Sequence, residues 1–184
     1  MTAVPLPGWA VVSPDRLRHI ERVAALVSEW AARMDVPPEE AGRWRRAVGL
    51  HDALRDAPED ALVRWAPDTP GPSELRHGPA SAARAAAEGE RDAGVLDAVR
   101  YHSVGWADWE LVGQVLYCAD YLEPGRRFAR EHRQALAARF PHDPGGVLRQ
   151  VATDRLAHLV ASGWPLPEPT VGFWNSLHAP SASR

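Results

Sequence analysis

The sequence contains no lysine: all 21 of its basic residues are arginine. We interpret this as the codon bias of a GC-rich genome, which concerns the ancestry of the protein and not its chemistry. A single cysteine, Cys118, excludes an internal disulfide. The formal net charge is −3, so the sequence lacks the basic excess that a general nucleic-acid-binding surface requires.

Long apolar runs are also lacking. No run approaches the roughly 20 residues that span a bilayer, and the first residues, MTAVPLPGWA, lack the basic and apolar segments of a signal peptide. We therefore expect a cytoplasmic protein that binds neither a membrane nor a nucleic-acid polymer. Its 184 residues are enough for one domain with a sizeable core.

The apolar residues recur with a helical period, and no alternating strand pattern stands out. Ser13, Pro14 and Asp15 form a helix start signal, and an apolar stripe with spacings of three and four follows to Met34. The expected helices cover approximately residues 14–34, 39–54, 59–65, 79–88, 93–102, 108–123, 126–139 and 147–161. The proline-rich stretch after Trp164 is expected to lie extended across them. The prediction is an all-α domain of seven or eight helices over residues 13–177, with tails at 1–12 and 178–184.

The eight histidines fall into two groups by their neighbours. Those on charged faces, in a loop or in the tail are expected at the surface: His132, His142, His158 and His178. The others lie among apolar residues, at His19, His51, His77 and His102, and two aspartates share that setting, Asp52 and Asp120. A single buried His-Asp pair would usually be a satisfied core histidine, but six such groups are too many for that explanation.

Imidazole nitrogens and carboxylate oxygens together suit zinc, manganese, iron or nickel. Six groups can hold two metals if one carboxylate bridges them, and phosphate hydrolysis uses metal pairs about 3.5–4 Å apart. His51 and Asp52 are adjacent, so their side chains differ by about 100° in direction around a helix. One can therefore bind a single metal while the other reaches between the two.

The order H…HD…H…H…D resembles that of the HD-domain metal phosphohydrolases. Flanking segments are similar to the YqeK family, bacterial HD proteins that hydrolyse diadenosine tetraphosphate symmetrically. These segments are RLRH (16–19), GLHD (49–52), LRHGPASA (75–82), VRYHSVGWAD (99–108), LYCADYLEPGRRF (116–128) and WN (174–175).

The resemblance implies an HD-domain helical bundle with two metals. One would be held by His19, His51, Asp52 and Asp120, and the other would share Asp52 and take His77 and His102. It also implies iron, although the sequence alone does not separate iron from manganese or cobalt.

The chain departs from the YqeK pattern at several positions. Arg55 stands where the family usually has lysine, in the turn after HD, and we expect it to contact phosphate and act in catalysis beside Asp52. Ile20 replaces a threonine, whereas Ser103 keeps a hydroxyl and is expected to contact the substrate. Trp106 replaces a basic residue and either stacks on a base or packs at the rim.

Two further arginines are candidate phosphate contacts. Arg16 lies one turn before His19 on the same helix face, and Arg126 follows Glu123 and Pro124. For both residues the alternative is an ordinary salt bridge.

The leading hypothesis is metal-dependent hydrolysis of diadenosine tetraphosphate, a small dinucleoside polyphosphate, to two ADP. The alternatives are an HD phosphohydrolase that acts on another nucleotide and a nucleotide-sensing module without turnover. A homodimer is one of the oligomeric states that the sequence allows.

Overall fold

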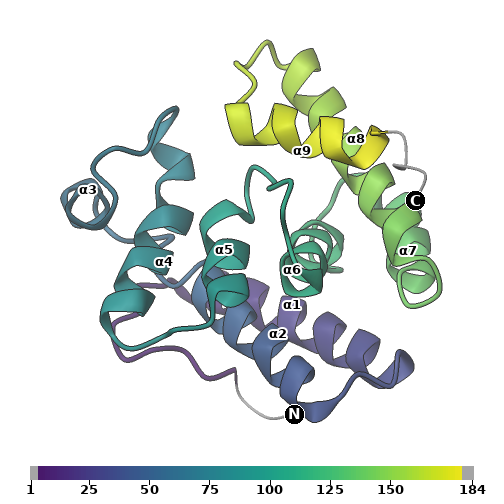
Figure 1. The fold of residues 1–184 in the computed structure, drawn as a ribbon, viewed down its shortest axis with the longest axis horizontal. Coiled ribbons are helices and arrows are strands. Elements are labelled where there is room, and N and C mark those ends of the chain that lie inside the picture. The colour runs from purple at the N-terminus through teal and green to yellow at the C-terminus, as the bar shows by residue number, and fades with distance from the viewer. Residues whose placement is uncertain (1–3, 180–184) are drawn as a thin grey trace.

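The computed structural model describes residues 4–179, and within this range the chain is entirely helical, as predicted (Figure 1). Residues 4–179 contain nine α-helices, and one short 3-10 helix, Ser73–Leu75, precedes the fourth. The α-helices are α1 (Pro14–Arg33), α2 (Pro38–His51), α3 (Glu59–Trp65), α4 (His77–Ala87), α5 (Ala93–Tyr101), α6 (Leu111–Leu122), α7 (Arg130–Arg139), α8 (Pro144–Ala161) and α9 (Glu168–His178).

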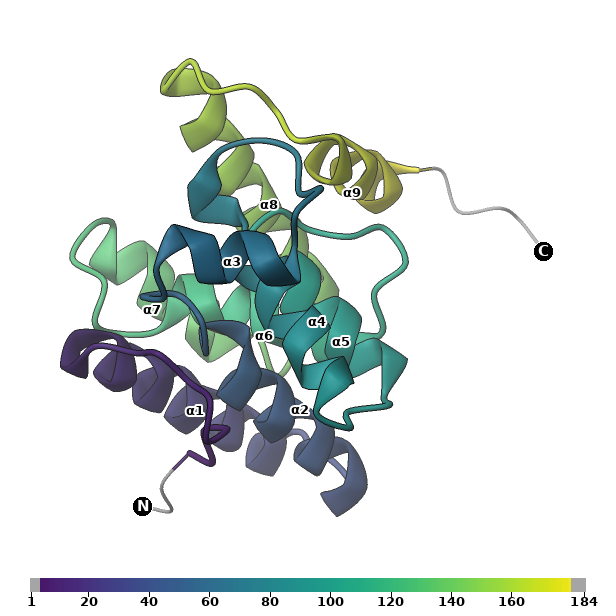
Figure 2. The same ribbon diagram turned by 90° about the vertical axis from the view of Figure 1, so that its left-hand side faces the viewer.

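Helices α2 and α6 lie at the centre of the bundle. Helix α2 contacts α1, α4, α5 and α6, while α6 also contacts α7 and α8, which carry the chain toward α9 (Figures 1 and 2). The core of the bundle is apolar. It includes the ring of Trp30 stacked on that of Phe140, with centroids 3.9 Å apart. This arrangement brings the last turns of α2, α5 and α6 to one place.

Side chains cap several helices at their first turn. Ser13 accepts a hydrogen bond from the backbone N–H of Arg16, and Asp92 accepts one from Val95 at the start of α5. Asp92 also forms an ion pair with Arg43 of α2, with 2.7 Å between Oδ2 and Nε. The pair fixes the start of α5 against α2.

Helix α4 lies unusually close to α5 at Gly78. A Cβ atom at this position would lie 2.9 Å from the carbonyl oxygen of Arg100 and 3.3 Å from the imidazole Cε1 of His102. Glycine is therefore required here for the close approach of the two helices.

Several expectations about the elements are wrong: residues 4–179 contain nine α-helices where seven or eight were expected, and the helix expected from residue 126 begins at Arg130. The second helix ends at His51 and not near Leu54, so the His51-Asp52 pair lies at a helix end followed by turns. The stretch predicted to be extended contains α9, since Pro169 falls in its first turn, where the missing N–H costs nothing. Thr170 and Phe173 bury one face of α9.

The described part of the N-terminal segment packs on the bundle. The N–H of Val11 donates to the carbonyl of Ala53 at 2.7 Å, and Trp9 packs beside Leu54. Residues 1–3 and 180–184 of the two predicted tails lie outside the described residues, and the domain boundaries stay a prediction. Among residues 4–179, no helix combines the length and the apolar character needed to cross a membrane.

Candidate metal centre

The six predicted ligands meet in the interior of the bundle. His19 comes from α1, His51 ends α2, Asp52 follows it, His77 begins α4, His102 follows α5, and Asp120 lies on α6. Each is at most 7% exposed. Their ligand atoms form two compact groups, which we call the Asp120 set (His19, His51 and Asp120) and the His77 set (Asp52, His77 and His102). The four remaining histidines are exposed, as expected.

The carboxylate of Asp52 lies between the two sets. Its Oδ1 is 3.2 Å from Nε2 of His77 and 3.6 Å from Nε2 of His102. Its Oδ2 is 3.6 Å from Nε2 of both His19 and His51. Each oxygen thus faces a different set, which is the arrangement expected of a bridging carboxylate.

Hydrogen bonds at Nδ1 define which nitrogen of each histidine carries a proton. Nδ1 of His51, His77 and His102 donates to the backbone carbonyls of residues 48, 74 and 99 at 2.7–2.8 Å. Nδ1 of His19 lies 3.2 Å from the carboxylate of Glu123. Because carbonyls and carboxylates only accept, Nδ1 must carry the proton, and in the neutral ring Nε2 presents a lone pair to the centre.

The neutral rings and the carboxylates thus turn acceptor atoms toward the interior, which fits a cation. Nε2 of His77 and Nε2 of His102 are only 3.1 Å apart, with Oδ1 of Asp52 beside both. Nε2 of His51 is buried and has no hydrogen-bond partner among residues 4–179, and Nε2 of His19 faces the carboxylate of Asp120. Buried polar atoms without partners are costly, and a metal ion would satisfy all of them together.

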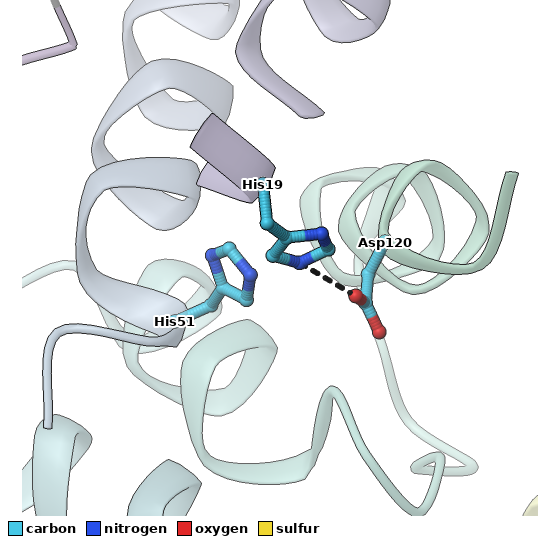
Figure 3. Close-up of side chains that lie close together, drawn as sticks. All are labelled: His19, His51 and Asp120. Atoms are coloured by element: carbon cyan, nitrogen blue, oxygen red, sulfur yellow. Dashed lines mark ion pairs between the residues drawn. The ribbon is translucent and has the colours of Figure 1, made fainter. Parts of the chain in front are cut away.

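The charges of the Asp120 set depend on its neighbours. Figure 3 shows His19 between His51 and Asp120, with its Nε2 3.1 Å from Asp120 Oδ1. Although burial opposes it, hydrogen bonds with Asp120 and Glu123 raise the pKa of His19 to about 9. Burial lowers the pKa of His51 to about 4, which keeps that ring neutral.

Asp52, Asp120 and His77 favour the forms that bind metals. Despite burial, neighbouring histidines hold the pKa of Asp52 well below its usual range, and His19 and Arg126 do the same for Asp120. Burial lowers the pKa of His77. Ionised carboxylates and neutral imidazoles are the states in which these groups coordinate.

Glu123 lies behind the centre, at a position for which the sequence predicted no role. Its side chain is buried, holds Nδ1 of His19, and accepts from Arg22 Nε at 2.5 Å and from the Gly125 N–H at 2.6 Å. Although burial opposes it, these hydrogen bonds lower the pKa of Glu123 to about 2. A carboxylate behind a ligating histidine fixes the ring and raises its basicity.

Three arginines contact the carboxylates of the centre. Arg16 donates to Asp52 Oδ2 at 2.7 Å, and Arg126 donates to Asp120 Oδ1 at 2.8 Å. Arg155 on α8 was not predicted. Its NH1 lies 3.5 Å from Asp120 Oδ2, and its NH2 donates to the carbonyl of Ser103 at 3.0 Å.

The other predicted contacts lie on the side of the His77 set. The Ser103 hydroxyl is 3.1 Å from Nε2 of His102. Arg55 is partly exposed, and its charge contributes to the lowered pKa of His77. Trp106 is stacked on Tyr101, with ring centroids 4.3 Å apart and planes inclined by 6°, so one of its faces is covered.

Named relatives match parts of the chain. A symmetrical bis(5′-nucleosyl)-tetraphosphatase from Halalkalibacterium halodurans (strain C-125) is 29% identical over 105 residues, which cover 56% of this chain and 55% of that protein. The protein of the same name from Bacillus subtilis (strain 168) is 45% identical over 56 residues, 30% of each chain. The matched segments thus span about half of the first relative and less than a third of the second.

A solved structure has the same fold. It is the crystal structure of a "predicted HD superfamily hydrolase involved in NAD metabolism" from Clostridium acetobutylicum, with a TM-score of 0.79 over 91% of each chain at 24% identity.

The family comparison covers the part of the chain that carries the ligands. Residues 16–125, more than half of the chain, match the family model described as HD domain. This range contains all six ligands, and the HD pair itself corresponds to His51 and Asp52, the residues at the centre of the two sets. The chain belongs to the HD domain family.

Proposed function

We propose that the protein hydrolyses diadenosine tetraphosphate to two molecules of ADP at a centre of two metal ions. The observation that carries the proposal is the position of Asp52, whose two oxygens face two separate sets of buried ligands. Further support comes from the names of the two relatives, both symmetrical bis(5′-nucleosyl)-tetraphosphatases.

The Asp120 set would hold one metal, the His77 set the other, and Asp52 would contact both. Iron is the metal that the resemblance to the YqeK family favours, and manganese and cobalt suit the same ligands. Bound divalent metals supply Lewis acidity, which makes water a better nucleophile near neutral pH and neutralises charge on phosphoryl oxygens.

The arginines of the chain would bind the phosphates. Arg16 and Arg126 line a cavity of about 260 Å³ that borders His19, and both guanidinium groups are partly exposed. Arg55 lies on the other side, near His77. Guanidinium groups can grip phosphate with two parallel hydrogen bonds, so the chain of phosphates can be held on both sides of the centre.

In the proposed reaction, the oxygen of one water molecule bonds to the second phosphorus. The bond from that phosphorus to the oxygen shared with the third phosphate breaks, and its electron pair leaves with the second ADP. The proton lost by the water passes to solvent. Because the metal ligands do not distinguish one phosphate from another, the distance at which the nucleoside is held must select the second phosphorus.

Product analysis tests this proposal. Anaerobically purified protein is analysed for metals and incubated with diadenosine tetraphosphate, and the nucleotides are separated by chromatography. We expect two metals per chain and ADP as the sole early product. Equimolar AMP and ATP would contradict the symmetric cut, and faster turnover of another nucleotide in an equimolar panel would contradict the substrate.

A further inference from the structure

A second cavity, of about 690 Å³, shares no lining residue with the one lined by Arg16 and Arg126. One wall is the loop after α3, residues 66–72, and the other is the segment before α9, residues 165–169. Figure 2 shows that these two segments face each other, although almost a hundred residues separate them in the sequence. The volume lies in the range typical of small-molecule sites, about 300–1,000 Å³.

Both walls are rich in proline. Pro67 and Pro70 lie on one wall, and Pro165 and Pro167 on the other. Proline rings are flat and apolar, and their fixed φ angles leave little backbone freedom to lose when a ligand binds. The cavity therefore offers a rigid slot for a flat, mostly apolar group.

Aromatic and polar side chains complete the lining. Trp65 and Tyr101 border the cavity, and Tyr101 is kept in place by its stack with Trp106. Asp68 and Glu168 add one carboxylate from each wall. Aromatic faces stack on bases, and carboxylates accept hydrogen bonds from ribose hydroxyls or base N–H groups.

Ser103 links the lining of the cavity to the metal centre. This residue lines the cavity, and its hydroxyl is 3.1 Å from Nε2 of His102 in the His77 set. Arg100 also borders the cavity and adds a positive charge. A ligand in the slot would thus extend toward the metals through a polar, cationic edge that suits phosphate.

The two cavities differ in what they can accept. The one beside Arg16 and Arg126 is small and charged, whereas the slot is larger and mostly apolar. Resting on the function proposed above, we infer that the slot binds one nucleoside of the substrate, and that the other half is held by its phosphates alone. It follows that a nucleotide with a single nucleoside should bind almost as well as one with two.

Filling the slot tests this inference. Ala83 of α4 lines the cavity, and Ala87 is exposed at the end of the same helix. We expect Ala83→Phe to weaken equilibrium binding of ADP to the metal-loaded protein by about tenfold or more, equivalent to about 1.4 kcal/mol. The matched variant Ala87→Phe should bind ADP like the wild type. Both should keep their metals, and inorganic tripolyphosphate should bind equally to all three proteins.

Unchanged binding of ADP to Ala83→Phe would overturn the inference, as would an equal loss with Ala87→Phe. Photo-crosslinking of wild-type protein with 8-azido-ADP does not depend on how a variant folds. Label in peptides containing residues 65–72 or 165–169 supports the slot, and label elsewhere contradicts it. Because binding and labelling need no turnover, they test the slot even if diadenosine tetraphosphate is not the substrate.

Discussion

The two ligand sets differ in what lies behind their histidines. In the Asp120 set, His19 is backed by the carboxylate of Glu123, and only His51 is backed by a backbone carbonyl. In the His77 set, both imidazoles are backed by neutral backbone carbonyls. The histidines of the first set thus depend in part on a charged side chain, whereas those of the second depend on where α4 and α5 place the backbone. Substitutions outside the ligands should therefore affect the two sets unequally.

We expect the largest loss of metal and activity when Asp52 is replaced, because this substitution should weaken both sets alike. Asp52→Ala deprives both sets of a ligand, so it should lose most of both metals and reduce turnover by about 10³-fold or more, equivalent to about 4 kcal/mol. Metal analysis and steady-state kinetics measure the change. His51→Ala should lose most of its metal and activity, whereas His142→Ala, on an exposed histidine, should lose neither. Wild-type metal content in Asp52→Ala would contradict the site.

Glu123→Gln should separate the two sets. The amide keeps the shape of the side chain but removes the charge behind His19, so metal affinity of the Asp120 set should fall by roughly 10–100-fold. The His77 set has no contact with Glu123 and should keep its metal. Titration with a chelator should then release one metal well before the other. Simultaneous release of both metals would mean that the two sets bind metal cooperatively and that Glu123 does not act on one set alone.

Arg155 connects the sets, since it contacts Asp120 and the backbone carbonyl of Ser103. We expect Arg155→Gln to lower kcat by about tenfold at saturating metal, equivalent to about 1.4 kcal/mol. Arg155→Lys keeps the charge but cannot reach both groups, and it should fall between the glutamine variant and the wild type. Equal activity of all three proteins would exclude a positioning role for Arg155.

Substitutions of Arg55 test whether a phosphate is bound near the His77 set. Arg55→Ala should weaken catalysis, because a phosphate contact is lost, and should leave metal content and melting temperature nearly unchanged. Arg55→Lys should stay active or gain activity. A marked fall in the melting temperature of the alanine variant would point instead to a structural ion pair.

We expect the smallest effect from the ion pair that joins α2 to α5, since it contributes to stability and does not contact the metal centre. Arg43 of α2 pairs with Asp92 at the start of α5, and these helices lead to His51 and His102. The hydrogen bonds from Arg43 lower the pKa of Asp92 to about 2, so its contribution to stability is present above pH 4 and is lost as the pH falls toward 2.

Asp92→Asn measures that contribution. The difference in unfolding free energy between wild type and variant, from urea unfolding with a chelator present, should be about 1–2 kcal/mol near pH 6 and should shrink between pH 4 and 2. If the difference in unfolding free energy does not change with pH, then Asp92 stabilises the protein by capping α5 and not through its charge.

The burial of the six candidate ligands in one place could be predicted because their residue types conflict with their surroundings. A histidine such as His51 in an apolar run needs a partner when it is buried. Six such groups along one chain are hard to explain except as a shared site. Glu123 could not be recognised in this way, because an acid before a proline usually marks an exposed turn. Its burial results from the packing of α1 against α6.

Arg155 and α9 illustrate two other limits. Arg155 is one of 21 arginines, and its contact with Asp120 depends on how α8 crosses α6, which no local pattern encodes. In α9, the prolines favoured an extended segment, but they occupy positions that a helix tolerates, and tertiary burial of Phe173 favours the helix. The all-α fold itself followed from the helical period alone.

The glycine at position 78 offers a criterion for sorting genomes. A Cβ atom there would push α4 away from α5 and so separate His77 from His102. Their Nε2 atoms lie 3.1 Å apart, and one metal can bind both only if they stay close. Among newly sequenced HD proteins, chains that keep all the histidines but carry a bulky residue in place of this glycine should have lost the second metal. Screening for His-Gly at this point should therefore select two-metal members of the family better than a search for the HD pair itself.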